Sequence, residues 1–165
     1  MLKNLAVLLF LSLIVFGGCS LFKAPSDSEI LGIKIGMNKG EAAKRLNEIG
    51  KFEKEESKQQ EVWALNNDPH YSYLILAFNK ETEKVRFITA KARENGIRLR
   101  YTDVLDIEKA QQRSSTNNYK YSQEVPGSAF KSGYTKIASG ADSSYLTYFS
   151  LKELNSFEEE EDEEK

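Results

Sequence analysis

The sequence between Tyr71 and Ala92 predicts a β-hairpin, in which the runs YSYLILAFN and KVRFITAKA are joined by the polar loop KETE. In the first run Leu74, Leu76 and Phe78 fall on one face of a strand, and the second run alternates in the same way. Four polar residues between two such runs suit a hairpin connection. This alternation fits an antiparallel sheet that has one face on the core.

A helix is predicted before the hairpin, from Lys39 to Ile49, because its apolar residues fall on one helical face. Asn38 is the candidate N-cap, and Glu41 lies three residues later, as in a capping box. Gly50 suits the residue that often follows a helix end. The segment from Lys51 to Gln60 is highly charged, and we expect it to be exposed.

Further elements complete the predicted order of helix, three strands, helix, three strands. They are a strand at Glu61 to Asn66, a helix at Asp103 to Gln112, and strands at Asn118 to Val125, Gly133 to Ser139 and Ser144 to Leu151. The predicted fold class is α+β, with an antiparallel sheet and helices packed on one face. The order also admits a tandem repeat of a helix plus three strands, with halves at 30–95 and 96–157.

The N-terminus has the pattern of a bacterial export signal. Residues 5–16 are apolar except for Ser12, a length that suits a signal-peptide core and falls short of the roughly 20 residues that span a bilayer. Phe16-Gly17-Gly18-Cys19 then resembles a lipoprotein cleavage site. The resemblance implies cleavage before Cys19, diacylglycerol on its thiol and acylation of the new amino group, and two or more acyl chains anchor a protein stably. The alternative is an ordinary signal peptide with a free thiol at Cys19.

The predicted organisation is a signal peptide at 1–18, a tether at 19–29, one α+β domain at 30–157 and an acidic disordered tail at 158–165. The tail holds seven acidic residues and one Lys. Such a run is typical of a solubilising tail. The alternatives are a segment that binds a partner, a segment that binds calcium weakly, or a segment that folds back over a basic face of the same chain. Ser20 in place of Asp after the lipidated Cys19 favours a location on the outer membrane, facing the periplasm.

The composition excludes several kinds of functional site. One Cys and one His provide neither a disulfide framework nor a Cys/His zinc cluster. His70 lies in the turn-rich segment NNDPH, and the sequence contains no nucleophile elbow, P-loop or G-x-G-x-x-G motif. We therefore expect no catalytic residues, no metal and no cofactor. We expect no nucleic-acid partner, because the export signal removes the chain from the cytoplasm.

Cationic and aromatic residues supply candidate positions for binding a partner. The cations between Arg86 and Arg100 are accompanied by one acid, Glu94, and could bind anionic lipid headgroups, lipopolysaccharide phosphates or an acidic protein. The alternative is a solvated strand face. Exposed Tyr and Trp side chains are favoured anchors at interfaces. The candidate partner-binding residues are Trp63, Tyr73, Arg86, Arg98, Arg100, Tyr101, Tyr121 and Tyr134.

The string IKIGMNKGEA, from Ile33 to Ala42, resembles the opening motif of the SmpA/OmlA family of small bacterial lipoproteins. The resemblance extends over about Gly32 to Ala92 and includes Trp63. It implies an architecture similar to the β-lactamase-inhibitor-protein fold. It also implies a noncatalytic, lipid-anchored envelope protein that acts through protein–protein contacts, as an accessory or scaffold of outer-membrane assembly. The alternatives are an inhibitor-like module that binds an envelope hydrolase, or a small ligand-binding protein or hydrolase.

Overall fold

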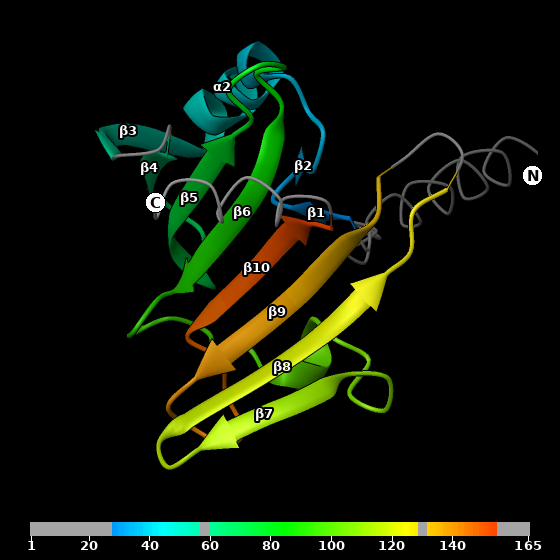
Figure 1. The fold of residues 1–165 in the computed structure, drawn as a ribbon. Helices are drawn as coiled ribbons and strands as arrows, with labels where there is room; N and C mark the ends of the chain where they lie inside the picture. The colour runs from blue at the N-terminus through cyan, green and yellow to red at the C-terminus, as the bar shows by residue number, and fades with distance from the viewer. Residues whose placement is uncertain (1–27, 57–59, 129–131, 155–165) are drawn as a thin grey trace, which may run out of the picture.

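The computed structural model describes residues 28–56, 60–128 and 132–154 (Figure 1). The predicted signal peptide, the predicted lipidation site Cys19 and the acidic tail lie outside these residues. The elements, in chain order, are β1 (Glu29–Ile30), β2 (Ile33–Lys34), α2 (Lys39–Ile49), β3 (Gly50–Glu56), β4 (Gln60–Leu65), β5 (Tyr71–Phe78), β6 (Val85–Ala92), the 3₁₀ helix η2 (Tyr101–Asp103), β7 (Gln111–Ser115), β8 (Asn118–Val125), β9 (Tyr134–Gly140) and β10 (Tyr148–Glu153). The described chain is therefore α+β with little helix.

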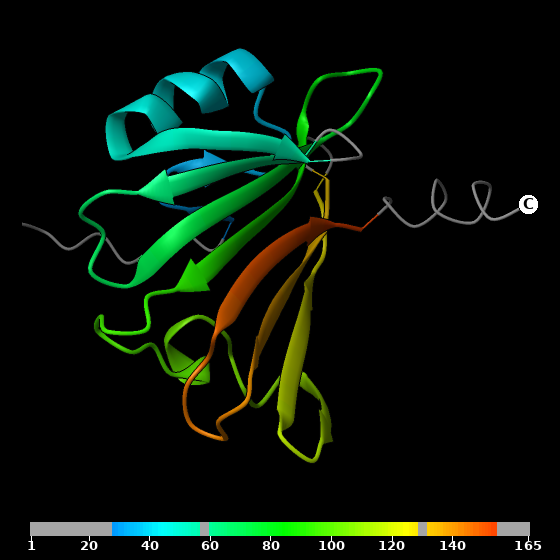
Figure 2. The same ribbon diagram turned by 90° about the vertical axis from the view of Figure 1, so that its left-hand side faces the viewer.

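Eight strands form one antiparallel sheet in the order β3-β4-β5-β6-β10-β9-β8-β7. Each half of the sheet is a four-stranded meander, and the two last strands, β6 and β10, join the halves (Figure 1). The two halves run in clearly different directions, because the sheet twists strongly (Figure 2). The order of the strands leaves β3 and β7 at the two edges.

The predicted hairpin is confirmed as β5 and β6. Leu74, Leu76 and Phe78 are all buried, as the alternation requires. The pairing changes register where Phe78 meets Val85, so that Arg86 is an extra residue in β6. This bulge brings Val85 to the same face as the later core residues of β6, and Val85 is fully buried.

The predicted helix is confirmed with its exact bounds, but its ends differ from the prediction. The side chain of Asn38 makes no capping hydrogen bond. The main-chain N–H of Lys39 instead donates to the carbonyl of Glu83 in the β5–β6 loop, at 2.9 Å. Gly50 is extended rather than left-handed, and an added β-carbon would lie 2.5 Å from the carbonyl oxygen of Ala64. Gly50 is therefore required by the close approach of β4.

The predicted helix at Asp103 to Gln112 is wrong. The chain forms only the short η2 and turns there, and β7 begins at Gln111. The main-chain N–H of Asp106 donates to the side-chain carbonyl of Gln123 on β8, at 3.1 Å, rather than to a helical carbonyl. Pairing of Gln111–Ser115 with β8 also competes with the helix, so tertiary contacts override the local helical spacing.

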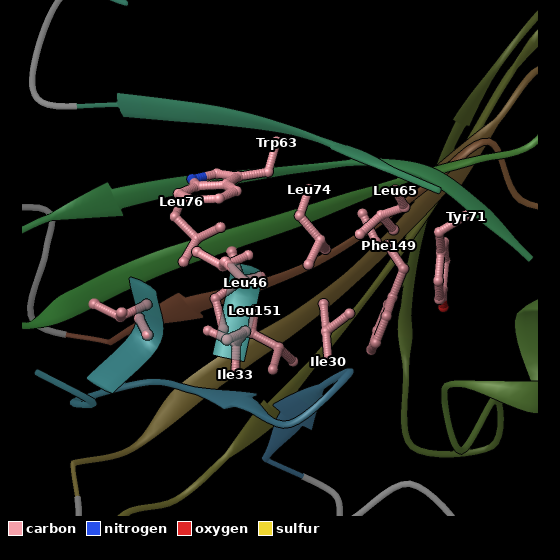
Figure 3. Packing of buried hydrophobic residues seen from close by; sticks show 14 of the residues in the cluster. Ile30, Ile33, Leu46, Trp63, Leu65, Tyr71, Leu74, Leu76, Phe149 and Leu151 are labelled. Carbon is pink, nitrogen blue, oxygen red and sulfur yellow. The ribbon is translucent and has the colours of Figure 1, made fainter. Parts of the chain in front are cut away.

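The hydrophobic core lies on one face of the sheet, which we call the inner face. The elements outside the large sheet all contribute to it: β1 and β2 through Ile30 and Ile33, α2 through Ala42 and Leu46, and η2 through Tyr101. Figure 3 shows Leu46 and Ile33 packed together with Leu76 and Leu151 of the sheet. The other face, the outer face, carries none of these elements.

Among the described residues, no helix is long and apolar enough to cross a bilayer.

Candidate functional site

A pocket of about 360 Å³ opens where the β9–β10 connection meets the segment around η2. We call it the arginine–tyrosine pocket. Its lining residues are Arg100, Tyr101, Thr102, Ile107, Tyr121, Ser143, Ser144 and Tyr145. The lining thus combines one cation, three tyrosines, three Ser or Thr side chains and one isoleucine, and it includes no carboxylate.

Tyr101 forms the floor of the pocket. Its side chain is buried, and its ring centroid lies 4.7 Å from that of Tyr121 on β8. Its hydroxyl donates to the main-chain carbonyl of Asp142 at 2.8 Å. Burial raises the pKa of Tyr101 to about 12, so the hydroxyl stays neutral at physiological pH. An added β-carbon at Gly140 would lie 2.9 Å from this hydroxyl oxygen, so a glycine is needed beside it.

Asp142 organises the loop that forms one wall. Its Oδ1 accepts hydrogen bonds from the main-chain N–H groups of Ser144, at 2.7 Å, and Tyr145, at 3.2 Å. Its Oδ2 accepts one from Arg98 at 2.9 Å. The hydrogen bond from Ser144 and the bond from Arg98 hold the pKa of Asp142 below its usual value. The carboxylate therefore stays ionised and keeps the loop in place at any physiological pH.

Arg98 and Arg100 play different parts at the rim. The guanidinium of Arg98 pairs with Asp142 and lies 3.9 Å from the ring centroid of Tyr145. The main chain of Arg100 pairs with Tyr145, and its N–H donates to Asp103 Oδ2 at 2.7 Å. Within residues 28–56, 60–128 and 132–154 the guanidinium of Arg100 makes no hydrogen bond or ion pair. Arg100 is exposed, so its charge is available to a ligand.

The structure brings four of the eight predicted partner-binding residues to this pocket: Arg98, Arg100, Tyr101 and Tyr121. Arg86 is distant from it, because the bulge that contains Arg86 lies at the other end of β6. Tyr73 is half-buried on the outer face of β5.

Trp63 and Tyr134 do not lie on the surface as the prediction required. Both belong to the core on the inner face, and their side chains are 5% and 7% exposed. Trp63 Nε1 donates to Glu61 Oε2 at 3.0 Å, and Glu61 Oε1 pairs with Lys39 at 3.0 Å. The indole N–H of Trp63 is thus hydrogen-bonded inside the fold. The large aromatic side chain of Trp63 packs in the core and does not serve as a surface anchor for a partner.

Sequence reasoning missed the wall formed by Asp142, Ser143, Ser144 and Tyr145. The signal was present in the string ADSSY, because Asp followed by small polar residues favours a turn in which the carboxylate binds main-chain N–H groups. Nothing local indicated that this turn would face Arg98 and Arg100, which lie more than forty residues earlier.

Arg93 belongs to the predicted cationic cluster, but its side chain stabilises the fold by binding main-chain carbonyls. Its guanidinium donates to the main-chain carbonyls of Asp68, Leu65 and Tyr71 at 2.9–3.1 Å. His70 lies in the same region, with Nδ1 3.1 Å from the carbonyl oxygen of Ile97. In the described part of the chain, no cluster of three or more His, Cys, Asp or Glu side chains could hold a metal ion.

Comparison with known proteins adds no relative: the chain matches no protein-family model, no curated protein and no solved structure. Its function therefore has to be inferred from the chemistry of the pocket.

Proposed function

We propose that the chain is a noncatalytic, lipid-anchored envelope protein that acts through protein–protein contacts, and that the arginine–tyrosine pocket binds an acidic segment of its partner. The observation that carries this proposal is the unpaired guanidinium of Arg100, held at the rim of a pocket lined by tyrosines. A guanidinium binds a carboxylate through two parallel hydrogen bonds. The rings of Tyr121 and Tyr145 offer apolar contact area beside that ion pair.

The lining favours binding over catalysis. General acid–base chemistry needs a titratable group that faces the ligand, and the lining contains neither a carboxylate nor a histidine. The three hydroxyl side chains, Thr102, Ser143 and Ser144, have no base among the lining residues that could activate them. They can instead donate hydrogen bonds to a bound carboxylate.

Attachment to the membrane through Cys19 and a role in outer-membrane assembly extend the proposal. They are supported by the cleavage-site pattern before Cys19 and by the opening motif from Ile33 to Ala42, whose last four residues begin α2. A finer proposal, a duplication of one ancestral half, is supported by the two matching four-stranded meanders that meet at β6 and β10. The second meander has η2 where the first has α2.

Site-specific photo-crosslinking in native membranes tests the pocket. A crosslinker at Ser143 should capture a partner protein through a peptide that contains Asp or Glu, and Arg100→Glu should abolish the capture. The matched control is Lys44→Glu, which reverses an exposed cation on α2 and should leave the capture intact. Capture that survives Arg100→Glu would remove the pocket from the proposal. Firm sedimentation of Cys19→Ser with membranes would contradict the lipid anchor.

A further inference from the structure

One row of paired residues crosses the outer face of the whole sheet. Directly paired residues of neighbouring antiparallel strands place their side chains on the same face. The row, from β3 to β7, consists of Lys51, Ala64, Tyr73, Lys91, Tyr148, Ser139, Lys120 and Arg113. We call it the basic row. It includes Tyr73, one of the residues predicted to bind a partner.

The basic row carries four cations and no acid. Lys51, Lys120 and Arg113 are exposed, and within the described ranges none of them makes an ion pair. Lys91 is paired only loosely, with its Nζ 4.0 Å from Glu94 Oε1. Arg113 and Lys120 lie directly opposite each other, an arrangement that costs stability because like charges repel. The row therefore has a positive charge that the described residues leave largely uncompensated.

Aromatic side chains lie between these cations. Tyr148 is 40% exposed and stands between Lys91 and Ser139, and Tyr73 stands on the other side of Lys91. A ligand of the basic row would therefore meet rings as well as charges. Tyr side chains supply contact area at little cost in side-chain entropy.

The shape of the sheet selects the kind of ligand. Neighbouring strands are about 4.8 Å apart, so the row is roughly 34 Å long. Adjacent strands also rotate by roughly 20–25°, so the row coils along its length, as the two strand directions in Figure 2 indicate. A flat bilayer can touch only part of such a row, whereas an extended polypeptide can follow it. The geometry favours an acidic polypeptide over an anionic membrane.

The same chain contains such a segment. We infer that the acidic segment from Glu158 to Glu164 folds back along β10 and binds the middle of the basic row, between Lys91 and Lys120. This segment consists of seven consecutive acidic residues, and its last three complement Lys91 and Lys120, the cations of the row nearest to Tyr148. The partner site in the arginine–tyrosine pocket involves other residues, so this inference is independent of the proposed function.

The segment starts close enough to reach the row. Leu154 is the last described residue, and its N–H donates to the carbonyl of Gly133 at 3.1 Å. Tyr148, the row residue of β10, lies six positions earlier, about 20 Å along the strand. An extended chain covers about 3.3 Å per residue, so seven residues beyond Leu154 span about 23 Å. Asp162 and the two glutamates that follow can then lie over Tyr148, and effective concentration favours this contact within one chain.

A synthetic peptide of residues 155–165 tests the inference against the full chain and a chain that ends at Leu154. The peptide should bind the truncated chain at least about tenfold more tightly than the full chain, because the tethered segment already occupies the row. Binding should weaken by about tenfold or more as NaCl rises from about 20 to about 300 mM, because the contacts are exposed ion pairs. Amide chemical shifts should change along the row, at Lys91, Lys120 and Tyr148.

Charge reversal locates the contact. The double variant Arg113→Glu with Lys120→Glu should lose the peptide, and so should Lys91→Glu, which lies on β6 on the other side of Tyr148 and guards against a local folding defect. Lys44→Glu on α2 is the control and should bind normally. Equal binding of the peptide to the full and truncated chains would overturn the inference, as would binding that survives both reversals. The inference would also be overturned if the truncated chain bound phosphatidylglycerol vesicles through these cations but did not bind the peptide. In that case the ligand of the basic row would be a membrane surface.

Discussion

Replacing Arg93 with Met should destabilise the fold, because the Arg93 guanidinium joins the β4–β5 connection to the end of β6. Its Nε donates to the carbonyl of Asp68 at 3.0 Å, and its Nη2 donates to those of Leu65, at 2.9 Å, and Tyr71, at 3.1 Å. All three acceptors are main-chain oxygens that precede or begin β5. Met has a similar stem but no donor, so the substitution removes the three hydrogen bonds and preserves most of the packing.

The size of the effect follows from the number and type of these bonds. A hydrogen bond that involves a charged group contributes about 1.5–3 kcal/mol. The three bonds share one half-buried guanidinium, and carbonyls near the surface can recover a water molecule, so we expect a total loss of about 2–3 kcal/mol rather than the sum. For a domain of this size each kcal/mol lowers the Tm by about 2–4 °C, so the Tm should fall by about 5–10 °C.

Urea and thermal unfolding, followed by circular dichroism and by the fluorescence of Trp63, measure the loss. Arg98→Met is the matched control, since Arg98 is exposed and its ion pair with Asp142 lies at the surface. Such a pair contributes about 0–1 kcal/mol, so the control should remain close to wild type. The reasoning about Arg93 would be refuted if Arg93→Met unfolded within about 1 °C of the wild-type protein.

Two further predictions concern packing and pH. Leu46→Ala should lower the free energy of unfolding in urea by about 2–5 kcal/mol, because Leu46 is fully buried and is the large side chain that α2 inserts into the core. The control Lys44→Ala, at an exposed position, should change the stability little. Similar stability of the two variants would contradict the proposed packing of α2. Burial raises the pKa of Tyr101 from 10.0 to about 12. As the pH rises, the unfolded chain therefore loses this proton at a lower pH than the folded chain does. The stability contributed by the neutral hydroxyl is complete below pH 10 and is lost as the pH rises towards 12. Phenolate absorbance should show late-titrating tyrosines that include Tyr71, because burial also raises the pKa of Tyr71. Tyr101→Phe should remove one late-titrating group, and an unchanged titration in that variant would contradict the assignment.

The elements that could be predicted from the sequence are those with a regular burial pattern. The β5–β6 hairpin and α2 each present one apolar face, so their periodicity is visible locally. The edge strands β3 and β7 were missed, because they are exposed on both faces and have no alternation. Their strand conformation comes from pairing with β4 and β8, and such pairing leaves no local pattern in the sequence.

The candidate site could be predicted only in part for a similar reason. Arg98, Arg100 and Tyr101 are close in the sequence, so their cluster was visible. The Asp142 loop that completes the pocket is distant along the chain, and the conspicuous Trp63 turned out to lie in the core. Residue type indicates what a side chain can do, but the burial of a side chain depends on which face of the sheet is covered.

Local periodicity and composition were sufficient to establish an α+β class, the position of α2, the approximate positions of six strands and the absence of a Cys/His zinc cluster, since each depends on neighbouring residues or on simple counts. The last of these strands, β10, begins at Tyr148 rather than at Ser144 as predicted, because residues 144 and 145 belong to the Asp142 loop. The joining of β6 to β10, the pocket around Arg100 and the basic row were decided only by the tertiary structure. Each of these depends on the register between strands that are far apart in the chain. That register is set by packing against a common core, which no short stretch of sequence contains.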